Sequence, residues 1–217
     1  MQCKGIIFDL DGTLLNTLVT LANSYNQALE EQEYPPHPTK SYKMFIGDGA
    51  RKCVERCLSP IKDEAAINRV LISQQAIYRA SWHQDTEPYA DILPLLEILD
   101  RQGLKLAVLS NKDHEFTCKL VAHFFGEALF SQVLGYGEGI KHKPDPGGAI
   151  KIARDFGLSP AEMAFVGDSK MDIQTAIASG MVPIGVKWGF RSETELKQSG
   201  CKILLHQPFD LLNWLSE

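Results

Sequence analysis

The sequence has no long apolar run and no surplus of positive charge. None of its apolar runs approaches the roughly 18 residues that a membrane-spanning helix needs. The first residues, Met1 to Lys4, lack the apolar stretch of a secretion signal. Lys and Arg total 22 against 27 Asp and Glu, a net charge of -5 that disfavours nonspecific attraction to nucleic acid or anionic lipid. We therefore expect a cytoplasmic protein with no nucleic acid and no membrane among its partners.

Cysteine is sparse and odd in number, which argues against a disulfide framework. The five cysteines are scattered at positions 3, 53, 57, 118 and 201, as suits a reducing compartment. Cys53 and Cys57 can share one face of a helix, but no further Cys or His stands near them at the spacing of a zinc site. We expect both to pack in a core.

Internal repeats and low-complexity tracts are also missing, and 44% hydrophobic with 23% charged residues is ordinary for a globular chain. Short runs rich in Ile, Val and Leu predict buried strands at 5–8, 104–109, 163–166, 182–186 and 203–205. Helical stripes lie between them at 92–99, 149–156 and 173–177, and a glycine follows each. Strands that alternate with single helices predict an α/β fold with a doubly wound parallel sheet.

The interval between the first two predicted strands is too long for one crossover helix. It contains helical patterns broken by Pro35–Pro38, Gly47–Gly49 and Ser59–Pro60, and no convincing strand. We predict a helical cap domain at residues 16–87, inserted into an α/β core domain of residues 1–15 and 88–217.

Asp9 and Asp11 stand where the first predicted strand stops. Side chains two residues apart on a strand point to the same side, so these carboxylates emerge together. Such a pair persists when a cation compensates it or when one member is protonated, and both situations serve catalysis. The alternative is a turn in which Asp11 and Gly12 only reverse the chain.

Three further groups follow predicted strands or precede predicted helices. Ser110 and Asn111 offer a hydroxyl and backbone N–H groups that suit phosphoryl oxygens, although either residue could simply cap a helix. Lys143 precedes a stiff Pro-Asp-Pro turn, and a solvated lysine is its alternative. Asp168 suits a hard cation such as Mg²⁺, and Asp172 can orient water or Lys143 behind it, unless the two acids only cap the next helix.

The order Asp-x-Asp-Gly-Thr, Ser-Asn, Lys-Pro and Gly-Asp-x-x-x-Asp resembles the haloacid dehalogenase-like superfamily over nearly the whole chain. Within it, residues 8–14, 46–50, 166–169 and 185–190 look like those of phosphoglycolate phosphatases. The resemblance implies a phosphoric monoester hydrolase that depends on Mg²⁺ and acts on a small phosphomonoester, with 2-phosphoglycolate as the expected substrate. Asn16 departs from the Asp that many relatives carry beside the cap hinge.

The resemblance also implies roles for the residues. Asp9 is the expected nucleophile, forming an aspartyl-phosphate, and Asp11 the expected acid and base. Asp9, Asp168 and the Asp11 carbonyl are the expected Mg²⁺ ligands, with Asp172 behind them. Substrate or phosphate binding is expected of Thr13, Ser110, Asn111 and Lys143. Within the predicted cap, the glycine-flexed loop from Gly47 to Arg51 also offers a cation that can meet a substrate carboxylate, and a solvated Arg51 is the alternative.

Other functions compete with this prediction. A pyrophosphatase, a sugar-phosphate phosphatase or a phosphomutase of the same superfamily carries nearly the same motifs. A phosphoacceptor signalling module also gathers acids, a hydroxyl and a lysine on a doubly wound sheet, but such modules are much shorter and lack the insert. The pattern makes no prediction between a monomer and a homodimer.

Overall fold

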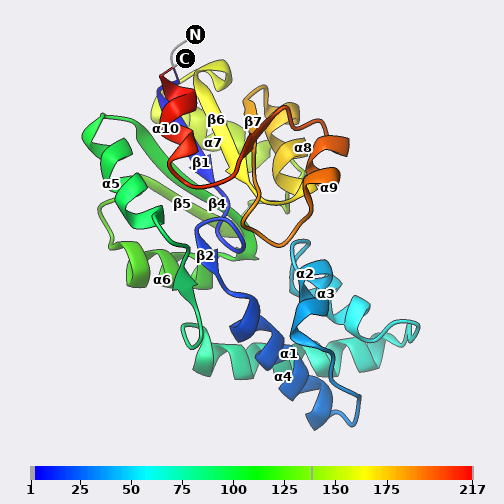
Figure 1. The fold of residues 1–217 in the computed structure, drawn as a ribbon. Helices are drawn as coiled ribbons and strands as arrows, with labels where there is room; N and C mark the ends of the chain where they lie inside the picture. Colours follow the sequence, from blue (N-terminus) through cyan, green and yellow to red (C-terminus); the bar gives the residue numbers. More distant parts are fainter. Residues whose placement is uncertain (1–2, 138, 217) are drawn as a thin grey trace.

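A parallel sheet forms the centre of the computed structural model, which describes residues 3–137 and 139–216 (Figure 1). Its six strands have the order β5-β4-β1-β6-β7-β8, and every neighbouring pair is parallel. The strands are β1 (Gly5–Phe8), β4 (Lys105–Asp113), β5 (Gln132–Tyr136), β6 (Met163–Gly167), β7 (Val182–Val186) and β8 (Ile203–Leu205). Residues 1–2, 138 and 217, which the predicted domain ranges include, lie outside the described part.

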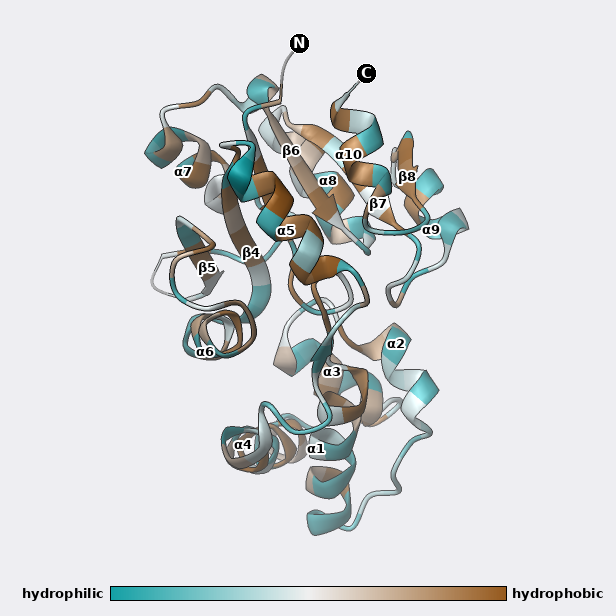
Figure 2. Cartoon of the chain, turned by 60° about the vertical axis from the view of Figure 1, so that its left-hand side comes forward, coloured by the Kyte–Doolittle hydropathy of each residue, from teal (hydrophilic) through white to brown (hydrophobic). Residues whose placement is uncertain are grey.

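Helices cover both faces of this sheet because the strand side chains alternate between two apolar layers. Ile6 and Phe8 of β1 pack toward α5 (Ile92–Arg101), α6 (His114–Phe125) and α10 (Asp210–Leu215). Ile7 packs toward α7 (Gly147–Phe156) and α8 (Lys170–Ser179) on the opposite face. The short helices α9 (Glu193–Gln198) and η2 (Pro160–Glu162) complete this part. In Figure 2, strands β4 and β6 and helix α5 are largely brown, the colour of hydrophobic residues.

A separate group of helices lies between two very short strands, β2 (Leu15–Asn16) and β3 (Glu87–Pro88), which pair antiparallel. The inserted helices are α1 (Leu18–Glu31), η1 (Thr39–Ser41), α2 (Tyr42–Phe45), α3 (Ala50–Cys57) and α4 (Glu64–Ser81). They share an apolar core of their own, to which α6 of the sheet domain adds Phe116. Figures 1 and 2 show them beyond the carboxyl ends of the strands. The predicted fold class, a doubly wound parallel sheet with an inserted helical segment, is confirmed.

The strand β5 has no counterpart among the predicted strands, and one predicted loop is wrong in part. The run from Gly135 to Gly139 lacks a strand pattern and reads as a loop, but Gly135 and Tyr136 belong to β5. This edge strand is half-buried, so its apolar run is short, and Gly135 serves packing: a Cβ there would come 2.6 Å from the Cα of His114. Within the described part, no helix is long and apolar enough to cross a membrane.

Candidate active site

Asp9 stands at the carboxyl end of the central strand β1. Its backbone N–H still donates to the Val166 carbonyl of β6 at 2.9 Å, so the sheet fixes where the residue lies. Its Oδ1 accepts a hydrogen bond from the Leu10 N–H at 2.7 Å and lies 2.7 Å from the Lys143 ammonium. The side chain is therefore oriented by groups that belong to separate stretches of the chain.

The turn after Asp9 passes close to Asp168, and Gly12 makes this possible. Gly12 has a φ of +85°, and a Cβ there would lie 2.5 Å from Oδ2 of Asp168. Only glycine fits such a position without strain or collision. The Asp-Gly pair does turn the chain, as the simpler interpretation held, and the same turn brings the first acidic motif against the last one.

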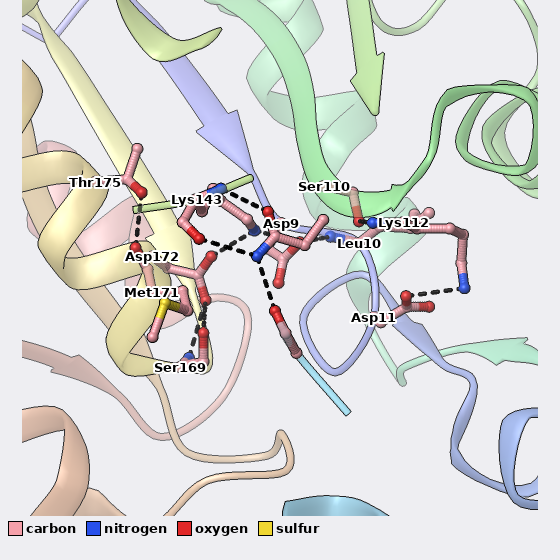
Figure 3. A network of polar contacts seen from close by, with 12 residues as sticks. Asp9, Leu10, Asp11, Ser110, Lys112, Lys143, Ser169, Met171, Asp172 and Thr175 are labelled. Atoms are coloured by element: carbon pink, nitrogen blue, oxygen red, sulfur yellow. Dashed lines mark hydrogen bonds and ion pairs between the residues drawn. The ribbon is translucent and has the colours of Figure 1, made fainter. Parts of the chain in front are cut away.

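Lys143 lies behind Asp9, buried between two carboxylates. Its Nζ is 2.7 Å from Asp9 Oδ1 and 2.6 Å from Asp172 Oδ1 (Figure 3). Burial alone would lower the pKa of Lys143, but the charges of Asp172 and Asp9 outweigh it and hold the pKa above its ordinary value. The lysine is therefore a permanent cation against both acids, and the solvated-lysine alternative does not describe it.

Asp172 opens helix α8 and takes part in a capping box with Ser169. Its Oδ2 accepts from the Ser169 N–H at 2.9 Å and from the Ser169 hydroxyl at 2.7 Å. Asp168 precedes this cap, and its Oδ2 accepts from the Phe190 N–H at 2.6 Å. Asp172 therefore does cap the helix, as the alternative held, but its other oxygen pairs with Lys143. Asp168 does not take part in the cap and lies near Asp9.

The buried acids carry more negative charge than their neighbours neutralise. Burial raises the pKa of Asp9 well above its usual range, and the charges of Asp172 and Asp168 raise it further against Lys143. Burial and Asp172 likewise raise the pKa of Asp168 to about 7, although the Phe190 N–H opposes this shift. Carboxylate oxygens of Asp9, Asp168 and Asp172 lie within 4.8 Å of one another. This cluster of hard oxygen donors can hold a metal ion, which would supply the missing positive charge.

Ser110 and Asn111 lie in an irregular stretch of β4, beyond the predicted end of that strand. The register between β4 and β5 shifts between Leu109 and Asp113, and both residues are buried. The Asn111 side chain accepts from the Lys143 N–H at 2.6 Å and donates to the Gly47 carbonyl at 2.9 Å. Asn111 therefore links the lysine loop of the sheet domain to the loop between α2 and α3.

Asp11 pairs with Lys112, a lysine for which the motifs predict no role. The Lys112 Nζ lies 2.9 Å from Asp11 Oδ2, and only 7% of the lysine side chain is exposed. The other oxygen of Asp11, Oδ1, is buried without a hydrogen-bond partner among the described residues. The neighbouring Thr13 is fully buried as well, and no partner is found for its hydroxyl in the described part of the chain.

Arg51 lies apart from the other predicted residues. Its side chain is 42% exposed on α3, pairs with Glu64 and lies 3.3 Å from Glu55. A different arginine, Arg191, reaches the loop between α2 and α3. It donates to the Ile46 carbonyl at 2.7 Å, and its Nε is 3.4 Å from Glu195. Arg191 follows the run 185–190 by one position, and its residue type alone does not predict this contact.

A cavity lies between the sheet domain and the inserted helices. From the sheet domain it is lined by Asp9, Asp11, Ser110, Asn111, Lys112, Asp113, Phe116, Asp168, Ser169, Phe190 and Arg191. The inserted helices and their loops add Leu21, Tyr25, Ile46, Gly47, Gly49, Ala50, Cys53, Gln74, Gln75 and Tyr78. Five of the predicted residues, Asp9, Asp11, Ser110, Asn111 and Asp168, thus face one space. Lys143, Asp172 and Thr13 lie behind its wall, and Arg51 lies outside it.

This arrangement of fold and acidic motifs is that of a known family. The family model of the haloacid dehalogenase-like hydrolases matches residues 6–186. The chain therefore belongs to the haloacid dehalogenase-like hydrolases.

Individual relatives show which members of this family the chain resembles. A phosphoglycolate phosphatase of Haemophilus influenzae is 33% identical, and the match covers 91% of this chain and 92% of the relative. A phosphoglycolate phosphatase of Mannheimia succiniciproducens is 32% identical, with 97% of both chains covered. The crystal structure of a protein from Lactobacillus delbrueckii subsp. bulgaricus, 31% identical, superposes with a TM-score of 0.94 over 99% of each chain. The chain is thus similar to phosphoglycolate phosphatases over nearly its whole length.

Proposed function

We propose that this chain is a Mg²⁺-dependent phosphatase that hydrolyses a small phosphomonoester through an aspartyl-phosphate on Asp9. The observation that carries the proposal is the position of Asp9 on the wall of the cavity between the sheet domain and the inserted helices. There Lys143 and the Leu10 N–H orient its side chain, and Asp168 lies close to it. The similarity to phosphoglycolate phosphatases makes 2-phosphoglycolate the first substrate to test.

In the first half of the reaction, a carboxylate oxygen of Asp9 attacks phosphorus, and the bond from phosphorus to the ester oxygen breaks. Lys143 and the Leu10 N–H hold Oδ1 of Asp9, so its second oxygen is the one presented for attack. Asp11 lines the same cavity two residues further on, and its protonated form, which carries the proton on the oxygen not paired with Lys112, gives that proton to the leaving oxygen. The products of this step are an alcohol and the aspartyl-phosphate.

In the second half, the Asp11 carboxylate takes a proton from a water molecule, whose oxygen attacks phosphorus and releases Asp9 and inorganic phosphate. The Ser110 hydroxyl and the backbone N–H of Asn111 bind the phosphoryl oxygens, since both residues line the cavity. Thr13 supports the turn that carries Asp11, because its N–H donates to the Leu10 carbonyl at 3.3 Å and its carbonyl accepts from the Trp188 indole at 3.0 Å.

The acidic cluster fits Mg²⁺, which prefers oxygen ligands and takes one or two protein carboxylates. Asp9, Asp168 and the Asp11 carbonyl would hold the ion, and Asp172 would keep Lys143 in place behind them. Bound there, the ion would offset the negative charge that opposes attack of a carboxylate on a phosphate dianion. The raised pKa values of Asp9 and Asp168 indicate that this positive charge is missing from the protein alone.

Residues 16–87 act as a cap over this site in our proposal, with the remaining residues as the catalytic core. The β2–β3 pair is the neck through which the chain enters and leaves the inserted helices. Closing the cavity excludes bulk water, which strengthens the electrostatic interactions inside. The Asn111–Gly47 and Arg191–Ile46 hydrogen bonds hold the loop between α2 and α3 against the core.

A screen of phosphate esters tests the proposal. The purified protein is incubated with 2-phosphoglycolate, sugar phosphates, nucleotides and pyrophosphate, in Mg²⁺ and in chelator, and phosphate release is measured. We expect release from a small phosphomonoester, highest for 2-phosphoglycolate, in the Mg²⁺ arm only. Equal release in both arms would contradict the metal, and conversion of a sugar phosphate without phosphate release would indicate a phosphomutase instead.

A further inference from the structure

Lys112 is a buried cation in the cavity that the proposed reaction does not use. Its side chain is 7% exposed, and its Nζ lies 2.9 Å from Asp11 Oδ2 and 4.9 Å from the centre of the Tyr78 ring. An ammonium has three N–H donors, and the pair with Asp11 takes one of them. Figure 3 shows this pair on the side of the site away from Lys143 and Asp172. Since the proposed reaction has Asp11 protonate the leaving oxygen, Lys112 lies on the leaving-group side of the site.

Tyr78 offers a second donor next to this ammonium. It lies on α4 and its side chain is buried. The Lys112 ammonium interacts with its oxygen, and no acceptor is found for its O–H among the described residues. Burial raises the pKa of this phenol, so the hydroxyl keeps its proton. A buried hydroxyl without an acceptor for its proton is unfavourable, and a ligand oxygen at this point would satisfy it.

The surroundings of the two donors are apolar on the helical side. Leu21, Tyr25 and Cys53 line the same cavity, and the Phe116 ring meets the Tyr78 ring edge to face at 5.0 Å. A cation in such surroundings interacts strongly with an anion that displaces the water around it. Another cation of the cavity wall, Arg191, is held by the Ile46 carbonyl and Glu195. Lys112 is the cation beside Asp11, so it is the one that an anionic group next to the leaving oxygen would reach.

We propose that Lys112 and Tyr78 form a subsite for a carboxylate on the leaving group, which selects phosphate esters of small hydroxy acids. The inference rests on the proposed function for the orientation of the substrate. In 2-phosphoglycolate the carboxylate is attached to the carbon that bears the ester oxygen, so binding of that oxygen at Asp11 brings the carboxylate beside the Lys112 ammonium. The predicted Arg51 subsite is an alternative that the same experiment tests.

Binding of non-hydrolysable analogues separates this subsite from the reaction. With Mg²⁺ present, titration calorimetry compares 3-phosphonopropionate, which keeps the carboxylate, with propylphosphonate, which lacks it. The readout is the ratio of the two Kd values. We expect the wild type to prefer the carboxylate by about 100-fold, Lys112→Met to bring the ratio within a few-fold of one, and Tyr78→Phe to lower it by about tenfold.

Two control variants show whether a change in the Kd ratio comes from Lys112 or from another cation. Lys119→Met removes an exposed lysine of α6, paired with Glu115 outside the cavity, and should leave the ratio unchanged. Arg51→Gln should also leave it unchanged, and a loss there with the preference intact in Lys112→Met would overturn our assignment in favour of Arg51. Tyr78→Phe keeps the shape of the side chain, so it remains informative if Lys112→Met fails to fold.

The two proposals fail in different ways. A preference for the carboxylate that depends on Lys112, in a protein that releases no phosphate from any ester, would uphold the subsite and contradict the phosphatase. Normal phosphate release with equal binding of both analogues, or with no loss of preference in Lys112→Met and Tyr78→Phe, would overturn the subsite alone.

Discussion

The two walls of the cavity differ in how their polar groups are used. On the core wall, charges are fixed by short hydrogen bonds: Lys143 holds Asp9 and Asp172 within 2.7 Å, and the Phe190 N–H holds Asp168. The wall of inserted helices is mainly apolar, with Leu21, Tyr25 and Cys53 among its residues. A preorganised set of charges suits chemistry that is the same for every phosphate ester. The boundary between the walls, where Tyr78 of the inserted helices lies beside Lys112 of the core, suits selection of the leaving group.

The contact between the walls combines the apolar packing of Phe116 on Tyr78 with polar bonds at the loop between α2 and α3. Asn111 and Arg191 of the core each donate to a backbone carbonyl of the loop between α2 and α3, at Gly47 and Ile46. Gly49 of the same loop packs on the His142 ring, where a Cβ would come within 2.5 Å. The polar bonds at this loop can break and form again at modest cost, as the proposed cap over the cavity requires.

The largest effect should come from the core wall. Lys143→Met leaves Asp9 and Asp172 without their shared cation, and we expect kcat to fall by about 1,000-fold or more. Breaking a buried ion pair also destabilises a protein by about 3–5 kcal/mol, so urea denaturation should show a lowered midpoint. Cys53→Ala on the opposite wall should change KM more than kcat. Wild-type kcat in Lys143→Met would contradict the view that the charges of the core wall carry the chemistry.

A second effect is the pH dependence of stability without metal. Because the pKa of Asp168 is raised from 3.8 to about 7 in the folded protein, its contribution to stability is fully present below about pH 3.8 and is lost as pH rises through about 7. The metal-free Tm should therefore fall over this window. Mg²⁺ at 100 times its Kd at pH 8 should restore about 2.7 kcal/mol at that pH, and the same concentration should restore less at about pH 5.5, where protons compete for the carboxylates.

Asp168→Asn is the control for this measurement, since an amide neither titrates nor replaces a carboxylate ligand. It should weaken the pH dependence, leaving the part that Asp9 contributes, and remove most of the stabilisation by Mg²⁺. A Tm that rises with pH in the metal-free wild type would mean that the acidic cluster is already neutralised by the protein itself.

The smallest effect should come from the contact between the walls. Asn111→Ala removes the side-chain bond to Gly47, and with it the side-chain bonds to the backbone N–H and C=O of Lys143, but keeps the backbone N–H proposed to bind phosphate. The one bond across the walls contributes about 1 kcal/mol, so we expect kcat/KM to fall by at least about fivefold. Hydrogen exchange of residues 46–49 should become faster. Unchanged exchange with a much larger loss of activity would show that the Asn111 side chain serves the chemistry instead of the closure.

The acidic motifs of the core wall are far more predictable from the sequence than the other residues that line the cavity, for a physical reason. Acids and polar groups that directly follow apolar runs can be predicted to lie together, because parallel strands gather their carboxyl ends at one edge of the sheet. The strand pattern alone therefore predicts Asp9, Ser110 and Asp168 at this edge. Lys112 and Arg191 are polar residues in polar stretches, and nothing in their neighbourhood predicts which of them turns inward. Arg51 is predicted at the site for its charge alone, yet local carboxylates hold it at the surface.

The fold shows the same division between strong and weak sequence signals. Continuous apolar runs predict β1, β6 and β7 within a residue or so, because these strands are buried on both faces. The edge strand β5 is half-buried and has no such run. The two-residue strands β2 and β3 are set by tertiary contact at the neck and have no pattern of their own.

The central claim is a covalent bond between phosphorus and Asp9, and rapid quench of the enzyme with a labelled phosphate ester tests it most directly. In the wild type we expect a burst of acid-stable label, located on Asp9 by peptide mapping and removed by hydroxylamine. Asp9→Asn, with a melting curve that shows it folded, should carry no label and should release phosphate at less than about one ten-thousandth of the wild-type rate. Undiminished phosphate release by Asp9→Asn would contradict the account.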